Sequence, residues 1–174
     1  MSQEHDDFDH QQRVEQLATN FGQAQQAVLR RLAALTDEEA VVSPPDGGWN
    51  AAQIGWHVAT VNLSLRGILC GERGTLAEPP MDFIETWEDK QRPGKLVAPP
   101  SFLPPSGVSR DEAVELVEEA SEAMTGAILA LTPDNARKVT QMRFGLISLY
   151  QVAEFARMHT QRHLSQLDRV LGPI

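Results

Sequence analysis

Cysteine is nearly absent from this 174-residue sequence, in which Cys70 is the single example. One cysteine cannot form an internal disulfide, and this usage is typical of a reducing compartment. Because Cys70 falls in a predicted helix, we expect a small buried apolar residue rather than a nucleophile. The first residues are polar and acidic, where a secretory signal needs a basic start and an apolar run. We therefore expect a cytoplasmic protein.

Basic residues are also few, since 15 Lys and Arg stand against 24 Asp and Glu, for a formal net charge of -9. Such a surface repels the phosphate backbone that nucleic-acid-binding proteins attract, so nucleic acid is not an expected partner. No apolar run approaches the ~20 residues that span a bilayer, so no membrane association is expected. The hydrophobic share of 41% suffices for one core, and we predict a single domain over residues 1–174.

Apolar residues recur at helical spacing in four segments, which predicts an all-α fold. The expected helices cover about 9–35, 50–69, 109–131 and 148–172, and no comparable strand pattern appears. Asn50 with Gln53, and Ser148 with Gln151, have the spacing of capping boxes at two helix starts. Four amphipathic helices with short and long connections predict an antiparallel-type four-helix bundle.

The connection between the second and third helices is long and rich in proline, over residues 71–107. A loop of this length is uncommon in a compact domain unless it has a role, so it is a candidate lid. Residues 81–87 could form a short helix after Pro80, and Phe83 and Trp87 could cover a site or simply the core. Both interpretations remain open at this point.

Three of the five histidines lie on apolar stripes. His159 and His163 are four residues apart on the last helix, and His57 takes an inward position on the second. His5 and His10 lie in a polar N-terminal segment, where we expect exposure to solvent. A single inward histidine is most often a hydrogen-bonded core residue, but three that converge favour a site for a divalent metal ion with an open fourth position.

The residues around these histidines resemble the DinB-like superfamily, in particular its YfiT-type metal-dependent hydrolases. The segment Trp49–Val58 resembles the family's W-S-x-x-E-x-x-x-H-L motif, and the last helix resembles its H-x-x-R-H-x-x-Q motif through His159, Arg162, His163 and Gln166. The resemblance implies a four-helix bundle with a long crossover loop and a metal, zinc or nickel, held by His57, His159 and His163. Asn50, Gln53 and Val58 depart from the family pattern, and Gln53 replaces an acidic residue.

The resemblance also implies a mixed set of activities, which include thiol-dependent S-transferases and a thiol-dependent isomerase. A metal with an open position can activate water for hydrolysis or bind a low-molecular-weight thiol. No Asp or Glu shares the inward stripes, and this lack of a general base favours thiol-dependent S-transfer or isomerisation of a small-molecule substrate. A metal-dependent hydrolase and a non-enzymatic metal-binding bundle are the alternatives, and a homodimer is one possible assembly.

Catalytic residues beyond the metal ligands are not identified by the sequence. Asp82, Glu85 and Glu88 of the loop could supply a base, and Arg162 could meet an anionic group, although a solvated position is the ordinary fate of such residues. Cys70 follows His57 by about 20 Å of helix rise and cannot join the three histidines. A closed structural site with a fourth protein ligand is therefore not expected.

Overall fold

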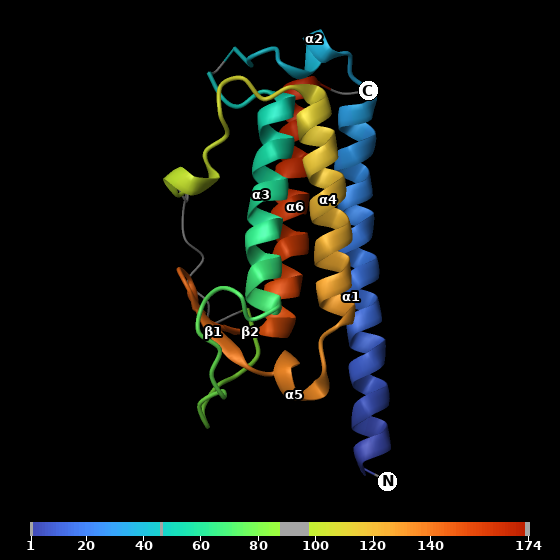
Figure 1. Ribbon diagram of the computed structural model, residues 1–174, viewed down its shortest axis with the longest axis vertical. Coiled ribbons are helices and arrows are strands. Elements are labelled where there is room, and N and C mark those ends of the chain that lie inside the picture. The colour runs from blue at the N-terminus through green and yellow to red at the C-terminus, as the bar shows by residue number, and fades with distance from the viewer. Residues whose placement is uncertain (1, 46, 88–97, 173–174) are drawn as a thin grey trace.

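The computed structural model describes residues 2–45, 47–87 and 98–172 of the chain, with side chains from residue 7 onward. Four long helices form a bundle (Figure 1): α1 (Ser2–Ala33), α3 (Ala51–Leu69), α4 (Arg110–Leu129) and α6 (Leu149–Leu171). Two one-turn helices, α2 (Asp37–Ala40) and α5 (Pro133–Ala136), lie in the connections. The four-helix bundle predicted from the apolar stripes is confirmed.

The helices that carry the three inward histidines begin at capping boxes, as the sequence predicts. In α3, Asn50 Oδ1 accepts from the Gln53 N–H at 2.9 Å, and Gln53 Oε1 accepts from the Asn50 N–H at 3.2 Å. In α6, Ser148 and Gln151 form the equivalent pair at 3.2 and 3.1 Å. Each pair satisfies backbone donors that a helix start leaves free, so both starting points are fixed locally.

The direction of the helices differs from a simple antiparallel bundle. α3 and α4 are neighbours and run in the same direction, and α1 and α6 are a second parallel pair (Figure 1). α1 and α3 lie diagonally across the bundle, while α6 packs against both. The crossover, residues 70–109, returns the chain to the end where α3 began, and this return makes α4 parallel to α3.

Two apolar clusters fill the bundle, one toward each end. The lower cluster in Figure 1 includes Phe21, Met124 and Leu149, and the upper cluster includes Leu32 and Ile54. The helices approach closely in the upper cluster. A Cβ atom added at Gly55 of α3 would lie only 2.8 Å from Leu32 Cδ1 and 3.3 Å from Ala113 Cβ. Glycine at this position permits the tight packing of α3 beside the site described below.

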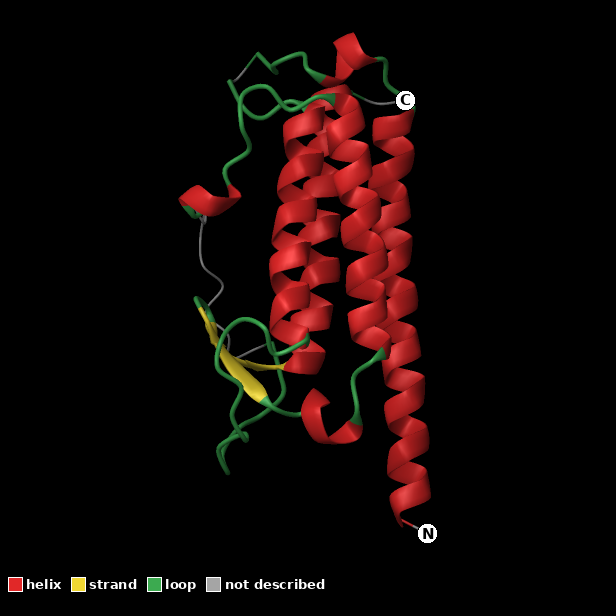
Figure 2. Ribbon diagram, in the orientation of Figure 1, coloured by secondary structure: helices red, strands yellow, loops and turns green. Residues whose placement is uncertain are grey.

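A small antiparallel hairpin precedes α6 and was not predicted (Figure 2). Strands β1 (Val139–Met142) and β2 (Gly145–Ser148) pair with Val139 opposite Ser148 and Met142 opposite Gly145. Strands of four residues are too short to give a clear alternating pattern, which explains why the sequence did not reveal them. β2 ends at the residue that caps α6, so the hairpin helps to place this helix.

The described part of the crossover has little regular structure. It contains the one-turn helix η1 (Pro100–Phe102) and an isolated bridge between Ala77 and Val139. The short helix that residues 81–87 could form is not present. Among the described residues, no helix combines the length and apolar character needed to cross a membrane.

Two predictions about individual side chains also need correction. His10 is half-buried rather than fully exposed: its Nδ1 accepts from the Tyr150 hydroxyl at 2.6 Å, and its Nε2–H donates to the Leu131 carbonyl at 2.9 Å. The loop before α5 and the start of α6 thus lie beside this turn of α1 and partly cover the imidazole. Cys70 is exposed rather than buried, because it follows the last residue of α3 as its C-cap. The side chain of His5 lies outside the described residues.

Candidate metal centre

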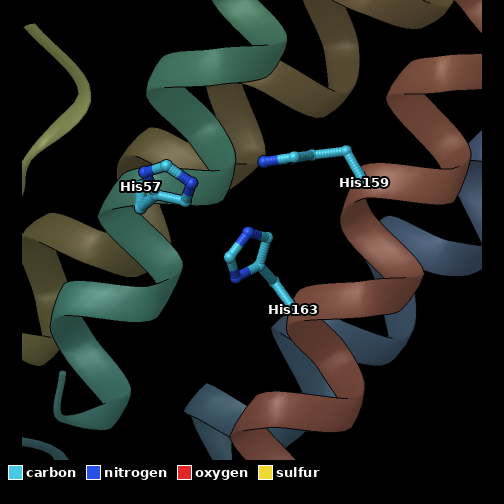
Figure 3. A group of neighbouring side chains, drawn as sticks. All are labelled: His57, His159 and His163. Atoms are coloured by element: carbon cyan, nitrogen blue, oxygen red, sulfur yellow. The ribbon is translucent and has the colours of Figure 1, made fainter. Parts of the chain in front are cut away.

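The three inward histidines meet in space between α3 and α6. One nitrogen each from His57, His159 and His163 lies within 4.8 Å of the others. The ring centroids are 4.5 Å apart for His159 and His163, 4.6 Å for His57 and His163, and 5.2 Å for His57 and His159. Figure 3 shows His57 on one helix facing the other two across the gap. The sequence prediction that these side chains converge is confirmed.

His57 is fixed from the crossover side. Its Nδ1–H donates to the Phe102 carbonyl at 2.7 Å, which leaves Nε2 available toward the other two rings. One turn earlier, Gln53 Nε2 donates to the Pro105 carbonyl at 3.1 Å. These two bonds hold the last part of the crossover against the start of α3. An acidic residue at position 53 could not make the bond to Pro105 when ionised, because it has no donor.

His163 is fixed by its own helix, and His159 is not. The Nδ1–H of His163 donates to Gln166 Oε1 at 2.9 Å, one turn further along α6. The Nδ1 of His159 is buried and has no hydrogen-bond partner among the described residues. Metal-binding histidines ordinarily donate the second ring N–H to an oxygen acceptor, so two of the three already meet this condition.

Aromatic side chains surround the three imidazoles. The Trp49 ring lies 4.7 Å from that of His57 and 6.4 Å from that of His163, and Phe155 lies 6.0 Å from His159. Phe155 continues through Phe144 to Trp87, with centroid distances of 4.9 and 6.1 Å. Two rings, those of Phe144 and Phe155, therefore separate Trp87 of the candidate lid from His159, and Trp87 packs against the lower cluster. The described part of the crossover that contacts the start of α3 and His57 lies at residues 99–105.

Burial keeps the three imidazoles neutral. It lowers the pKa of His57, against the opposing effect of the Phe102 carbonyl. Burial also holds the pKa of His159 well below its ordinary value, with the charges of His163, His57 and Arg162 acting in the same direction. The pKa of His163 falls to about 4, again mainly through burial and then through His57. Neutral imidazole is the form that binds a metal ion.

These shifts predict that the metal-free protein loses stability as the pH falls from about 6.5 to about 4. An unfolded histidine binds a proton near pH ~6.5, whereas folded His163 stays neutral down to about 4. Within this window the unfolded state binds more protons, so the free energy of unfolding decreases with decreasing pH. Denaturant titrations at pH 7.5 and 5.0 should show a smaller decrease for His163→Asn than for the wild type. An identical decrease in both proteins would contradict the assignment.

The donor set fits a divalent transition metal. Three neutral nitrogen donors on two helices suit a divalent transition metal, and hydrogen bonds already orient two of the three rings, those of His57 and His163. Within the described residues, no carboxylate or thiol joins the group. The residues present could therefore hold a metal ion and leave a coordination position for another molecule.

The expected base candidates do not reach the histidines in the part of the chain that is described. Glu85 pairs with Arg13, and Asp82 is exposed. Glu88 lies outside the described residues. Arg162 is exposed on α6, and its charge contributes to the lowered pKa of His159 and His163. Neither Asp82 nor Glu85 therefore balances the positive charge that Arg162 brings near the histidines.

Comparison with known proteins identifies the family. The family model of the DinB superfamily matches residues 20–167, which is most of the chain. The chain belongs to the DinB superfamily. No curated protein matches this member of the superfamily. Its structure is similar to that of YfiT from Bacillus subtilis, described as a probable metal-dependent hydrolase with an unusual four-helix bundle topology. The TM-score is 0.55 at 16% identity, over 90% of this chain and 86% of that chain, and this likeness shows the fold.

The sequence of this DinB superfamily member did not predict several of the residues that contact the three histidines. Trp49 entered the sequence analysis only as the first residue of a motif, yet its ring lies against His57 and His163. Phe102 acts through its backbone carbonyl, which no side-chain pattern can reveal. The spacing of His163 and Gln166, three residues apart on a helix, was a usable signal for their contact.

Proposed function

We propose that His57, His159 and His163 bind one divalent transition metal, zinc or nickel, and that the protein catalyses thiol-dependent S-transfer or isomerisation of a small molecule. The observation that carries the proposal is the convergence of three neutral imidazoles, with no carboxylate joining them among the described residues. When bound there, a divalent ion would supply Lewis acidity, which favours deprotonation of a thiol or a water molecule.

Residues around the three histidines orient the imidazole rings and shape the surroundings of a bound reactant. The Phe102 carbonyl and Gln166 Oε1 fix the ring orientations of His57 and His163, so that Nε2 of each faces the centre. The Trp49 and Phe155 rings limit access of water beside the histidines. The positive charge of Arg162 favours an anionic reactant such as a thiolate.

The lack of a carboxylate in the histidine group, within the described part of the chain, supports a thiol over water as the nucleophile. Hydrolysis ordinarily needs a positioned base to accept a proton from water, whereas a thiol has a much lower pKa and needs less assistance. In the transfer, the thiol sulfur bonds to an electrophilic carbon of the substrate. The leaving group departs with the electron pair of the broken bond, and the thiol proton passes to solvent.

A metal-dependent hydrolase is the second candidate. It is favoured by the similarity in fold to YfiT, which is described as a probable enzyme of that kind. A non-enzymatic metal-binding bundle is the third candidate. It would need the open position to be closed, and Cys70 cannot do this because it is exposed beyond the far end of α3.

One experiment separates these three functions. Zinc-loaded and nickel-loaded proteins are incubated with an alkyl halide or an activated ester, with and without cysteine, glutathione or coenzyme A. We expect consumption of the alkyl halide to accelerate only when a thiol is present, and His163→Ala to remove this effect. His10→Gln, which removes an imidazole outside the centre, is the matched control and should retain the activity.

The other outcomes would replace the proposal. Ester hydrolysis without a thiol, lost in His163→Ala, would assign the hydrolase function. Full metal occupancy without either activity would assign a binding protein.

A further inference from the structure

A layer of polar side chains separates the two apolar clusters of the bundle. On α1, Phe21 belongs to the lower cluster and Val28 to the upper one, and the fully buried Gln25 lies between them. On α6, the lower cluster ends at Ala156 and the upper one resumes at Leu167. Thr160 lies in this interval and is also fully buried. We call Gln25, Asn62 and Thr160 the polar layer.

Asn62 connects the polar layer to the helix of the metal centre. Its side chain is fully buried on α3, and its Nδ2 donates to Thr160 Oγ1 at 3.1 Å. Thr160 in turn donates to the Ala156 carbonyl at 2.9 Å, so its hydroxyl is occupied as both donor and acceptor. Thr160 directly follows His159, so Asn62 lies against the turn of α6 that carries this candidate ligand.

Four buried polar atoms in this region have no hydrogen-bond partner among the described residues. They are Asn62 Oδ1, His159 Nδ1 and both amide atoms of Gln25. An unpaired buried polar atom costs roughly 1–3 kcal/mol, and buried water ordinarily removes this cost. The set is chemically balanced, because the Gln25 NH₂ and the His159 N–H are donors while the two amide oxygens are acceptors. Water molecules, which both donate and accept, can satisfy all four.

We propose that the polar layer is an internal hydration site in which buried water accepts the Nδ1–H of His159 and donates to Asn62 Oδ1, with Gln25 holding the water on the α1 side. The inference rests on the proposed metal-binding function. It gives His159 the oxygen acceptor that Phe102 provides for His57 and Gln166 for His163. Asn62 and Gln25 are thus positioning residues for the metal centre, and they act through His159 rather than on the metal.

The test measures zinc affinity and stability separately. Asn62→Leu and Gln25→Leu remove the polar groups with little change in volume, and Asn62→Asp retains the oxygen acceptor. Thr140→Val removes a buried polar group from β1 and is the matched control. We expect each leucine variant to lower zinc affinity at least about 10-fold, measured by competition with a chelator. Asn62→Asp should lose no affinity, because it keeps an oxygen acceptor and a negative charge there would favour the cation, and Thr140→Val should stay near the wild-type affinity. The metal-free leucine variants should unfold at no lower urea concentration.

The proposal is overturned if both folded leucine variants bind zinc within about twofold of the wild type. A purely structural role is indicated instead if stability and affinity fall together in all four variants. Nitrogen-15 NMR of the histidine rings in metal-free protein decides independently of metal binding. The layer predicts a hydrogen-bonded His159 Nδ1–H with a downfield proton shift in the wild type, and an upfield change of that shift in Asn62→Leu. An unchanged shift in Asn62→Leu would contradict it, whereas the expected change without any zinc binding would reject only the proposed function.

Discussion

Replacing His159 by alanine is expected to abolish stoichiometric metal binding, with zinc affinity reduced more than about 100-fold. Loss of a hydrogen bond to a ligand costs about 10–100-fold, so loss of the ligand itself should exceed that range. The remaining pair would be His57 and His163, and the described residues near them offer no carboxylate or thiol as a replacement. Metal content after dialysis against a weak chelator, measured by elemental analysis of untagged protein, provides the readout.

The control for this variant is His10→Gln, because His10 bonds to Tyr150 and Leu131 and not to the centre. It should retain one metal ion per chain even if its stability is lower. Tight retention of one ion by His159→Ala would remove His159 from the ligand set and with it the proposed site.

Replacing Phe21 by alanine is expected to destabilise the metal-free protein by about 3–5 kcal/mol. Phe21 is fully buried in the lower cluster, where truncation leaves a cavity among side chains from several helices. The free energy of unfolding from urea titration monitors the loss. A change below about 1 kcal/mol would mean that the lower cluster is packed less tightly than the structure shows.

Metal removal should affect the fold less than this single substitution. The two apolar clusters include none of the three histidines, so chelation should lower the melting temperature and leave helical circular dichroism intact. Complete loss of the helical signal on chelation would show that the metal is structural.

The long helices could be predicted because their signals are local. Asn50 and Ser148 mark helix starts by their own chemistry, and apolar spacing marks the buried faces. The hairpin at β1 and β2 depends on pairing with each other and with Ala77, which is distant in sequence. Parallel placement of α3 and α4 likewise depends on the path of the crossover, which composition does not determine.

The candidate ligands could be predicted because polar residues on apolar stripes are conspicuous. Their surroundings could not, since the Phe102 carbonyl and the Trp49 ring reach the centre through the fold of the loops before and after α3. Gln25 and Asn62 were overlooked for a different reason. Each is a single amide side chain on an apolar stripe. Their connection becomes visible only in the structure, where both are buried between the two apolar clusters.

X-ray absorption spectroscopy of the zinc-loaded, untagged protein tests the central claim most directly. Imidazole rings give a characteristic multiple-scattering pattern, whose amplitude reports how many histidines bind the metal. The account predicts three imidazoles, no sulfur from the protein in the absence of added thiol, and loss of the pattern in His159→Ala. A spectrum with fewer than three imidazoles, or one unchanged in that variant, would contradict the assignment of His57, His159 and His163 as the metal centre.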